Sequence, residues 1–474
     1  MVASKKHLFH CLSLFLVIIF FEFQSGSLKF WYDDDDDGTT GTFNAFDRYG
    51  TWRALILYFL RILSLLPLPQ ILFNFFGLLL FDAFRESRRI DKPPKTMPFL
   101  CFRSVTRGDF PELVNHNILR NLDLCLDVNL ENFIIEVVTD KYFDIPKHPK
   151  IRLIVVPKNY QTRSGALFKA RALQYCIDVN DLNDDDWIVH LDEETLLTPQ
   201  SLSGIIEFVC DGRYQFGQGM ITYSNGEIVN WLTTLSDMFR VAEDMGKLRF
   251  QFYFFHKPIF SWKGSYVVSK VKAETIVGFD FGPDGSIAED CYFSMIAYVK
   301  GYDFNFINGE MWEKSPFTLM DFLRQRKRWL QGIYLVVHSR NIPLKVKFWL
   351  GVSLYAWITT PLVLTNLIFF KLFPLPANDL INFFSTFVAA IGFYLYIFGV
   401  FKSFSINKIG FPRYILILIA SLLTMPLKAI IESIAVIWGM ATDKHQFFVV
   451  EKQKTSIRPI FCLKKKKTYP IDMV

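Results

Sequence analysis

The chain lacks the features of disulfide-rich, zinc-binding and nucleic-acid-binding proteins. Its 474 residues include only seven cysteines, scattered from Cys11 to Cys462, and none forms a closely spaced zinc-type pair. Isolated thiols suit a reducing compartment such as the cytosol. The formal net charge is only +6, and the positive residues cluster at 85–95, 324–328 and 464–467. That clustering indicates membrane flanks and a phosphate site, so we expect no nucleic-acid partner.

Apolar and aromatic residues are abundant instead. The chain is 51% hydrophobic and 17% aromatic, with 50 phenylalanines, which is too apolar for an ordinary soluble enzyme. Two apolar runs, 8–23 and 54–81, lie near the N-terminus, and Pro67 and Pro69 interrupt the second. The first run is either a cleaved signal peptide or a retained anchor. We favour the anchor, because residues 25–27 are small but form no clean cleavage pattern.

Three further apolar runs follow the middle of the chain, at residues 348–370, 381–401 and 414–440. The first two are long enough to span a bilayer. The third contains Pro426, Lys428 and Glu432, so it spans with a kink, re-enters, or lies partly in the interface. Three full spans would separate the basic tail from the middle domain, whereas the positive-inside rule places both on one side.

Charge also predicts the orientation of the middle domain. An acidic tract, residues 33–37, follows the first run, and basic residues at 85–92 follow the second. The positive-inside rule therefore places the acidic tract outside and the middle domain in the cytosol. The expected divisions are an N-terminal membrane region, a catalytic domain, C-terminal membrane helices and a basic tail, at residues 1–84, 85–345, 346–441 and 442–474.

The middle domain has the pattern of an α/β fold. Residues 133–138, 151–156 and 187–191 are β-rich, and 164–176 has helical spacing. This alternation predicts a βαβ unit and a mainly parallel sheet. Asp140 follows the first strand and Asp192 the third, at the strand ends where open α/β sheets bind ligands. Each could also be a solvated acid at a strand end or turn.

Three other sets of residues could bind a cation, act in catalysis or bind phosphate. Asp192 and Glu194, read as one face of an extended segment, could hold a hard divalent cation, Mg²⁺ or Mn²⁺; the alternative is an acidic turn. Glu289 and Asp290 begin a helix, where they could cap it or provide a general base. The last set precedes the C-terminal membrane runs and either binds phosphate or anchors an interfacial helix: Gln325, Arg328 and Trp329.

Together these four sets of residues, which we call the four stations, resemble the motifs of membrane-bound family 2 glycosyltransferases. The stations are Asp140; Asp192 and Glu194; Glu289 and Asp290; and Gln325, Arg328 and Trp329. The resemblance implies a GT-A-type nucleotide-sugar transferase domain flanked by N- and C-terminal transmembrane helices. It also implies catalytic roles for Asp290, as base, and Glu289, with inversion at the anomeric carbon. Donor contacts would come from Asp140, Asp192, Gln325 and Arg328, and the divalent cation would bind Asp192 and Glu194. Acceptor contacts would come from Trp329 and Trp262.

Longer peptides narrow the resemblance. Residues 162–176, 190–195, 260–265 and 315–332 resemble the Egghead family of invertebrate β-1,4-mannosyltransferases. This likeness implies GDP-mannose as donor, glucosylceramide as acceptor, and an endoplasmic reticulum or Golgi membrane with the catalytic domain facing the cytosol. Two alternatives remain open: a glucosylceramide or polysaccharide synthase with the same motifs, and a non-catalytic membrane scaffold. Oligomeric state is not predicted.

Overall fold

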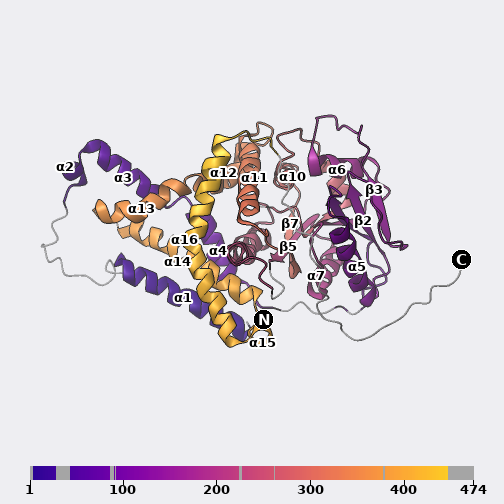
Figure 1. Cartoon of the computed structure of the whole chain (residues 1–474), viewed down its shortest axis with the longest axis horizontal. Coiled ribbons are helices and arrows are strands. Elements are labelled where there is room, and N and C mark those ends of the chain that lie inside the picture. Colours follow the sequence, from indigo (N-terminus) through magenta and orange to yellow (C-terminus); the bar gives the residue numbers. More distant parts are fainter. Residues whose placement is uncertain are drawn as a thin grey trace.

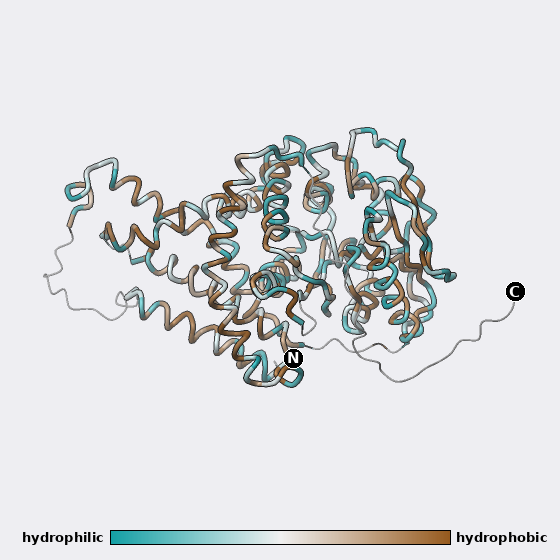
Figure 2. The backbone as a smooth tube through the Cα atoms, in the orientation of Figure 1, coloured by the Kyte–Doolittle hydropathy of each residue, from teal (hydrophilic) through white to brown (hydrophobic). Residues whose placement is uncertain are grey.

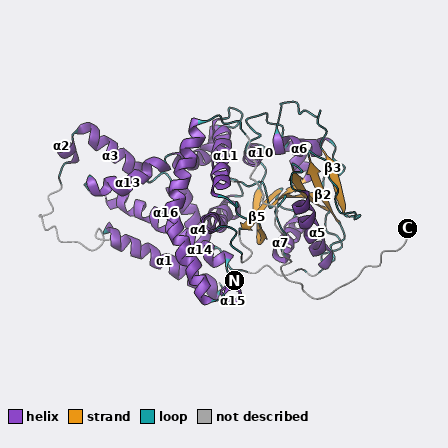
Figure 3. Cartoon of the chain, in the orientation of Figure 1, coloured by secondary structure: helices purple, strands orange, loops and turns teal. Residues whose placement is uncertain are grey.

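The structure is a computed structural model that describes residues 4–27, 43–85, 90, 92–223, 227–260, 262–376 and 379–446. The acidic tract at 33–37 and the basic tail at 464–467 lie outside these residues. Strands gather at one end of the molecule and long helices extend from the other (Figure 3). The α/β domain and the apolar helices are thus two layers of one molecule.

A seven-stranded sheet organises the α/β domain, with strand order β3-β2-β1-β4-β6-β5-β7. Strands β1 to β4 pair in parallel, as do β5 and β7, while β6 runs antiparallel between β4 and β5. The expected mainly parallel sheet is therefore confirmed. The strands are β1 Leu100–Thr106, β2 Phe133–Thr139, β3 Ile151–Val155, β4 Trp187–Asp192, β5 Phe216–Thr222, β6 Val267–Lys270 and β7 Phe304–Trp312.

Helices connect and cover these strands. The helix expected over residues 164–176 is α6, Phe168–Asp178, and it begins later than expected. Gly165 has a φ of +77°, and the Asp280 carboxylate accepts from the Ser164 amide at 2.7 Å, so the chain turns before the helix starts. The other helices of the domain are α5 Pro111–Asp127, α7 Pro199–Asp211, α8 Trp231–Glu243, η2 Asp244–Leu248, η3 Gln251–Phe255, α9 Val271–Val277, α10 Glu289–Val299 and α11 Leu319–His338.

Long apolar helices form the second layer (Figure 2). Among the described residues, four helical stretches are long and apolar enough to cross a membrane, or five if a pair bent by 52° counts as one span. The bent pair is α12 and α13, and a break at Pro67 separates α3 from α4. The helices of this layer are α1 Lys5–Ser25, α2 Ala45–Tyr49, α3 Thr51–Leu63, α4 Leu68–Leu80, α12 Leu344–Ile358, α13 Thr360–Leu372, α14 Asp379–Ser403, α15 Ile406–Ile409 and α16 Phe411–Ala441.

The apolar helices run away from the sheet and back again (Figure 1). Helix α1 leads outward and α3–α4 leads back, so that the Ser4 amide at the start of α1 donates to Asp82 at 2.8 Å. Helices α12–α13 lead outward again, to a point where the Tyr49 hydroxyl donates to the Pro374 carbonyl at 2.9 Å. Helix α14 returns, and Lys402 near its end pairs with Glu310 of β7 at 3.5 Å.

Helix α16 does not lead outward. It begins beside the end of α14, crosses α13 and α14, and ends against α11 (Figure 1). There the Gln331 amide donates to the Gly439 carbonyl at 3.0 Å, and just beyond it His445 contacts Asp284 at 2.7 Å. The C-terminal end of α16 thus lies at the α/β domain. From this arrangement we predict that the basic tail lies on the same side of the membrane as the α/β domain.

The two layers pack through close backbone contacts. A Cβ atom on Gly399 of α14 would lie 2.1 Å from the Met238 carbonyl oxygen of α8. A Cβ atom on Gly77 of α4 would lie 2.0 Å from the Gly246 carbonyl oxygen of η2. Only glycine permits such approaches. One continuous core of buried residues consequently includes side chains from the sheet, from α8 and from the apolar helices.

Candidate active site

One cavity of about 1080 Å³ lies between the carboxyl ends of the strands, α11 and the apolar helices. The four stations are far apart in the sequence, but all of them reach this cavity. The structure therefore brings together every residue that the sequence singled out. These lining residues are Asp140, Asp192, Glu194, Trp262, Glu289, Asp290, Gln325, Arg328 and Trp329.

Asp290 and Glu289 occupy the first turn of α10, as expected. The Cys291 amide donates to Asp290 Oδ1 at 2.7 Å, which fixes the carboxylate. Burial and the neighbouring charge of Glu289 raise the pKa of Asp290 to about 7, although the charge of Lys169 opposes the shift. A carboxylate with such a pKa can take up and release a proton near neutral pH.

Lys169, from the first turn of α6, links two of the acidic stations. Its Nζ donates to Asp192 Oδ1 at 2.6 Å and to the Gly264 carbonyl at 3.1 Å, and it lies 3.7 Å from Glu289 Oε1. Burial alone would lower the pKa of Lys169, but the nearby carboxylates raise it, and Asp192 has the largest effect among them. The ammonium therefore stays charged. Lys169 therefore offsets the repulsion among Asp192, Glu289 and Asp290.

The segment after β4 is not extended, which corrects the geometry expected for Asp192 and Glu194. The Thr195 amide donates to the Asp192 carbonyl at 3.0 Å and closes a turn, so Glu193 and Glu194 are turn residues. Period-two alternation consequently does not apply to them. Glu193 accepts a hydrogen bond from the Thr106 hydroxyl, and it lines the cavity together with Asp192 and Glu194.

Glu313 is another cavity carboxylate, one that sequence reasoning missed. It directly follows β7, and its Oε1 accepts from the Thr195 hydroxyl at 2.6 Å. Burial and the charges of Glu194 and Asp192 raise the pKa of Glu313 to about 7. The signal was present in the sequence, because Glu313 follows an apolar strand just as Asp140 and Asp192 do.

Asp140 directly follows β2, which lies near the opposite end of the strand order from β7 and Glu313. Its Oδ1 accepts from Arg171 Nη2 at 2.5 Å, and the Arg171 guanidinium is also held by the Pro157 and Tyr160 carbonyls. Asp140 is thus a fixed acceptor group on the cavity wall. A fixed carboxylate of this kind can accept hydrogen bonds from ribose or base.

The expected helix around Gln325, Arg328 and Trp329 is α11, and the Thr318 side chain caps it by accepting from the Asp321 amide. Two guanidinium groups, those of Arg240 and Arg326, each lie 4.4 Å from the Trp329 ring centroid. These cation–π contacts fix the ring. Trp262 is 6% exposed and packs edge-on against Phe252 and Phe304, so little of its ring faces the cavity.

Arg326 holds α11 in place, a role that sequence reasoning did not assign. Its Nη2 donates to Asp237 of α8 at 2.6 Å, and its Nε lies 3.4 Å from Glu432 of α16. Removal of one partner from such a buried ion pair is strongly destabilising. Arg326 thereby joins the helix that bears Gln325 and Arg328 to both layers of the molecule.

Comparisons with known proteins identify the family. A model of glycosyl transferase family group 2 matches residues 187–427. The chain is 56% identical over 454 residues to the β-1,4-mannosyltransferase egh of Drosophila melanogaster, covering 95% of this chain and 98% of that protein. It is 52% identical over 455 residues to the β-1,4-mannosyltransferase bre-3 of Caenorhabditis elegans, covering 95% and 99%. The chain belongs to this family of glycosyltransferases.

A solved structure also aligns with this glycosyltransferase, namely the mannosyltransferase PcManGT from Pyrobaculum calidifontis in complex with GDP-Man and Mn2+. The identity is 15% and the TM-score 0.44, and the alignment covers 78% of this chain and 99% of that one.

The carboxylates of the glycosyltransferase site fit a divalent cation. Asp192, Glu194 and Glu313 all line the cavity and offer hard oxygen ligands. Burial, together with repulsion from the charges of Glu194 and Asp192, raises the pKa of Glu313. A cation between them would relieve that repulsion, so the donor set suits Mg²⁺ or Mn²⁺.

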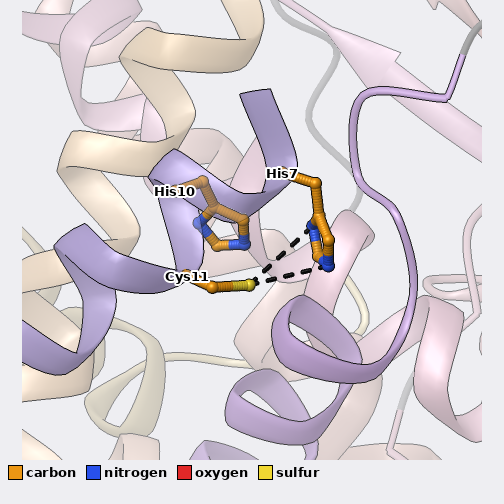
Figure 4. Close-up of side chains that lie close together, drawn as sticks. All are labelled: His7, His10 and Cys11. Carbon is orange, nitrogen blue, oxygen red and sulfur yellow. Dashed lines mark hydrogen bonds between the residues drawn. The ribbon is translucent and has the colours of Figure 1, made fainter. Parts of the chain in front are cut away.

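Among the described residues, cavity carboxylates included, only His7, His10 and Cys11 of α1 place three potential metal-binding atoms within 4.8 Å of one another (Figure 4). Both His10 ring nitrogens already have partners: the Tyr394 hydroxyl at 2.6 Å and the Leu78 carbonyl at 3.0 Å. His10 thus joins α1 to α4 and α14 by hydrogen bonds. This cluster stabilises the helix layer of the glycosyltransferase and does not need a metal.

Proposed function

We propose that the enzyme transfers mannose from GDP-mannose to the glucose of glucosylceramide, and that it forms a β-1,4 linkage with inversion. The observation that carries this proposal is the single cavity. Its walls combine the acidic stations of a nucleotide-sugar transferase with residues of five apolar helices, α4, α12, α13, α14 and α16. A donor dissolved in water and an acceptor anchored in a membrane can therefore meet there.

Relatives support the sugar and the linkage. Proteins more than half identical over nearly their whole length carry the name β-1,4-mannosyltransferase. The likeness of residues 162–176, 190–195, 260–265 and 315–332 to the Egghead family supports GDP-mannose and glucosylceramide as the substrate pair. A glucosylceramide or polysaccharide synthase would share the acidic stations but would use another donor or acceptor.

The side chains divide between donor and acceptor. Asp140 accepts hydrogen bonds from the nucleoside, while Gln325 and Arg328 on α11 hold the diphosphate, for which a guanidinium is well suited. Asp192 and Glu194, with Glu313 beside them, would hold a divalent cation. When bound, that cation supplies positive charge to the diphosphate leaving group. Acceptor contacts would come from Trp329 and, to a smaller extent, Trp262, which both line the cavity.

Asp290 performs the proton transfer. Its carboxylate accepts the proton of the acceptor hydroxyl, whose oxygen forms a bond to the anomeric carbon of mannose. The bond from that carbon to the diphosphate oxygen breaks, and GDP leaves with the electron pair. Attack from the face opposite GDP converts an α-linked donor into a β-linked product. Glu289 and Lys169 set the charge around Asp290.

The proposed setting is a membrane of the endoplasmic reticulum or Golgi, with the catalytic domain facing the cytosol, where GDP-mannose is available. Helix α1 stays in the enzyme as an anchor, supported by its hydrogen bonds to α4 and α14. The domain boundaries near residues 84, 345 and 441 mark changes of solvent environment. They are not packing boundaries, because one core runs through both layers.

A donor-competition assay tests this function. Membranes that contain the full chain receive glucosylceramide with radiolabelled GDP-mannose, UDP-glucose or UDP-N-acetylglucosamine, and lipids are then extracted. We expect label in the glycolipid fraction from GDP-mannose alone, and β-mannosidase should release it. The Asp290→Asn variant is the control for host enzymes. Label from a UDP-sugar instead would assign the enzyme to another synthase.

A further inference from the structure

Beyond the acidic stations, part of the cavity is lined by side chains of the apolar helices. We call this part the helix-side chamber. It contains polar and charged side chains that belong neither to the four stations nor to the donor contacts described above. Its residues are Gln70 of α4, Trp357 of α12, Tyr396 of α14, and Lys428 and Glu432 of α16.

Lys428 is the unusual member of this chamber. Only 9% of its surface is exposed, and its Nζ lies 3.8 Å from the Phe239 ring centroid and 5.6 Å from that of Tyr396. Among the described residues, no carboxylate lies within 4.0 Å of this Nζ and no hydrogen bond to it is found. Burial of an ammonium group that has only aromatic contacts is unfavourable in free energy. A ligand oxygen that accepts a hydrogen bond from it would offset much of that penalty.

Glu432 lies one helical turn from Lys428 and provides the opposite chemistry. Its Oε2 accepts from the Trp357 indole Nε1 at 3.0 Å, and its Oε1 lies 3.4 Å from Arg326 Nε. These contacts hold the carboxylate in place, while its side chain remains 14% exposed. A carboxylate accepts hydrogen bonds from hydroxyl groups but repels a phosphate.

Trp357 completes the set. The hydrogen bond to Glu432 fixes the orientation of its indole, and the half-buried ring lines the cavity beside both charged groups. One donor, one acceptor and one aromatic surface suit a neutral, hydroxyl-rich ring. A phosphate head group would instead need several free cations, and Lys247 and Arg326 are already paired with Glu243 and Asp237.

We propose that the helix-side chamber is the subsite for the sugar head group of the lipid acceptor. Lys428 donates to a sugar hydroxyl, Glu432 accepts from another, and Trp357 packs against the ring, with the reactive hydroxyl directed toward Asp290. The proposal rests on the proposed function for its lipid acceptor. It adds the residues that select a neutral glycolipid over a lipid phosphate.

Kinetics of the full-length enzyme in detergent test this assignment. Lys428→Met retains the length and the aromatic contacts of the side chain and removes the charge. We expect its KM for glucosylceramide to rise about tenfold to a hundredfold, the cost of losing a hydrogen bond to a charged group. Its KM for GDP-mannose should stay within about twofold of the wild type.

Lys402→Met is the matched control, since Lys402 also lies on an apolar helix but outside the cavity, where it pairs with Glu310. It should leave the acceptor KM unchanged. An equal acceptor KM in the Lys428 and Lys402 variants would overturn the proposal. So would a parallel rise in the donor KM, and so would a wild-type enzyme that prefers a polyprenyl phosphate to glucosylceramide.

Photo-crosslinking separates this proposal from the proposed function, because it needs no turnover. Glucosylceramide with a photoreactive group on its glucose is irradiated with the wild-type enzyme, and labelled peptides are mapped. We expect label within α12 and α16 that unlabelled glucosylceramide displaces and Lys428→Met reduces. Label confined to other helices overturns the subsite. Failure of mannose transfer in an enzyme that is labelled there overturns the proposed reaction alone.

Discussion

The environment of Asp290 gives its carboxylate a pKa that suits the proposed role of general base. Burial and Glu289 disfavour its ionised form, while Lys169 and the Cys291 amide favour it. The balance brings the pKa of Asp290 to about 7, so the carboxylate is a stronger base than an exposed aspartate and is still ionised in part at neutral pH.

We expect Asp290→Asn to lower turnover by about a hundredfold to ten-thousandfold, the usual loss for a general base. GDP-mannose affinity should change little, because the side chain keeps its size. Single-turnover transfer and equilibrium donor binding, measured on the same preparation, check both parts. Near-normal turnover in this variant would exclude Asp290 as the base.

The pH profile gives a second prediction for Asp290. Since the base must be ionised, kcat/KM of the wild type should fall as pH drops below the raised pKa of about 7. The measurement is kcat/KM from about pH 5.5 to about pH 8.5, which reports the free enzyme. Glu313 has a similarly raised pKa. If Asp290 is responsible, Glu313→Gln keeps the acidic limb and the residual activity of Asp290→Asn loses it.

The acidic wall predicts dependence on a divalent cation. Asp192→Ala and Glu194→Ala should each weaken GDP-mannose binding, because fewer oxygens remain to hold the cation against the diphosphate. Donor binding is measured by calorimetry with Mn²⁺ and again after EDTA. Glu207→Ala, an exposed acid on α7 outside the cavity, is the control. Donor affinity and transfer that survive excess EDTA would contradict this prediction.

Individual residues show what the sequence could predict and where it failed. Asp140, Asp192 and Asp290 were found because a strand or helix boundary precedes each of them. Glu313 obeys the same rule and was overlooked. The orientation of Glu193 and Glu194 was wrong, because a single hydrogen bond from Thr195 decides between an extended segment and a turn. Hydrophobic periodicity shows which face of an element is buried, so it carries no information about a local hydrogen bond of this kind.

At the scale of elements, strands β2, β3 and β4 were predicted to within about one residue, because their apolar runs end at charged or turn residues. Length and hydropathy located the membrane helices only to within about four residues at each end. The expected span at 348–370 is two helices, α12 and α13, bent by 52°. The docking of the membrane helices was not predictable. Helices α8 and η2 lie inside the α/β domain in sequence but pack on α14 and α4, and only the glycines at 77, 246 and 399 reflect those close contacts.

The glycine contact gives a prediction for α14. Gly399→Ala would place a methyl group against the Met238 carbonyl and should destabilise the enzyme by about 1–3 kcal/mol, the usual cost of overpacking. The matched control is Gly392→Ala on the same helix, where a Cβ meets nothing within 4 Å. Thermal unfolding in detergent should show a lower Tm for the first variant alone. Equal Tm values would mean that α8 and α14 separate easily.

At the scale of the whole molecule, α16 decides the topology. Hydropathy counts it with the membrane-spanning helices, and by composition it qualifies. Its C-terminal end nevertheless contacts the α/β domain, where the Gln331 amide donates to the Gly439 carbonyl. The sequence alone does not show on which side of the membrane the C-terminal tail lies, because hydropathy gives the length of an apolar segment and not the direction in which it runs.

Labelling of sealed microsomes with a membrane-impermeant maleimide checks this topology. Cys210 is exposed on α7, so it should react from the cytosolic side, and so should Cys462 in the tail. Each is tested with the other changed to serine. Asp47→Cys on α2, in a variant without both, should react only after detergent is added. Protection of Cys210 in intact microsomes would place the catalytic domain in the lumen.

The backbone contacts at Gly77 and Gly399 have a consequence for selectivity. Because these contacts join the helix layer to the α/β domain, the distance between Asp290 and the candidate membrane helices is fixed. With the lipid acceptor proposed above, such an enzyme would accept a hydroxyl at only one distance from the membrane surface. Each added sugar moves the new terminal hydroxyl further out, beyond the reach of the base. A rigid joint between two layers would thus be enough to stop synthesis after a single mannose.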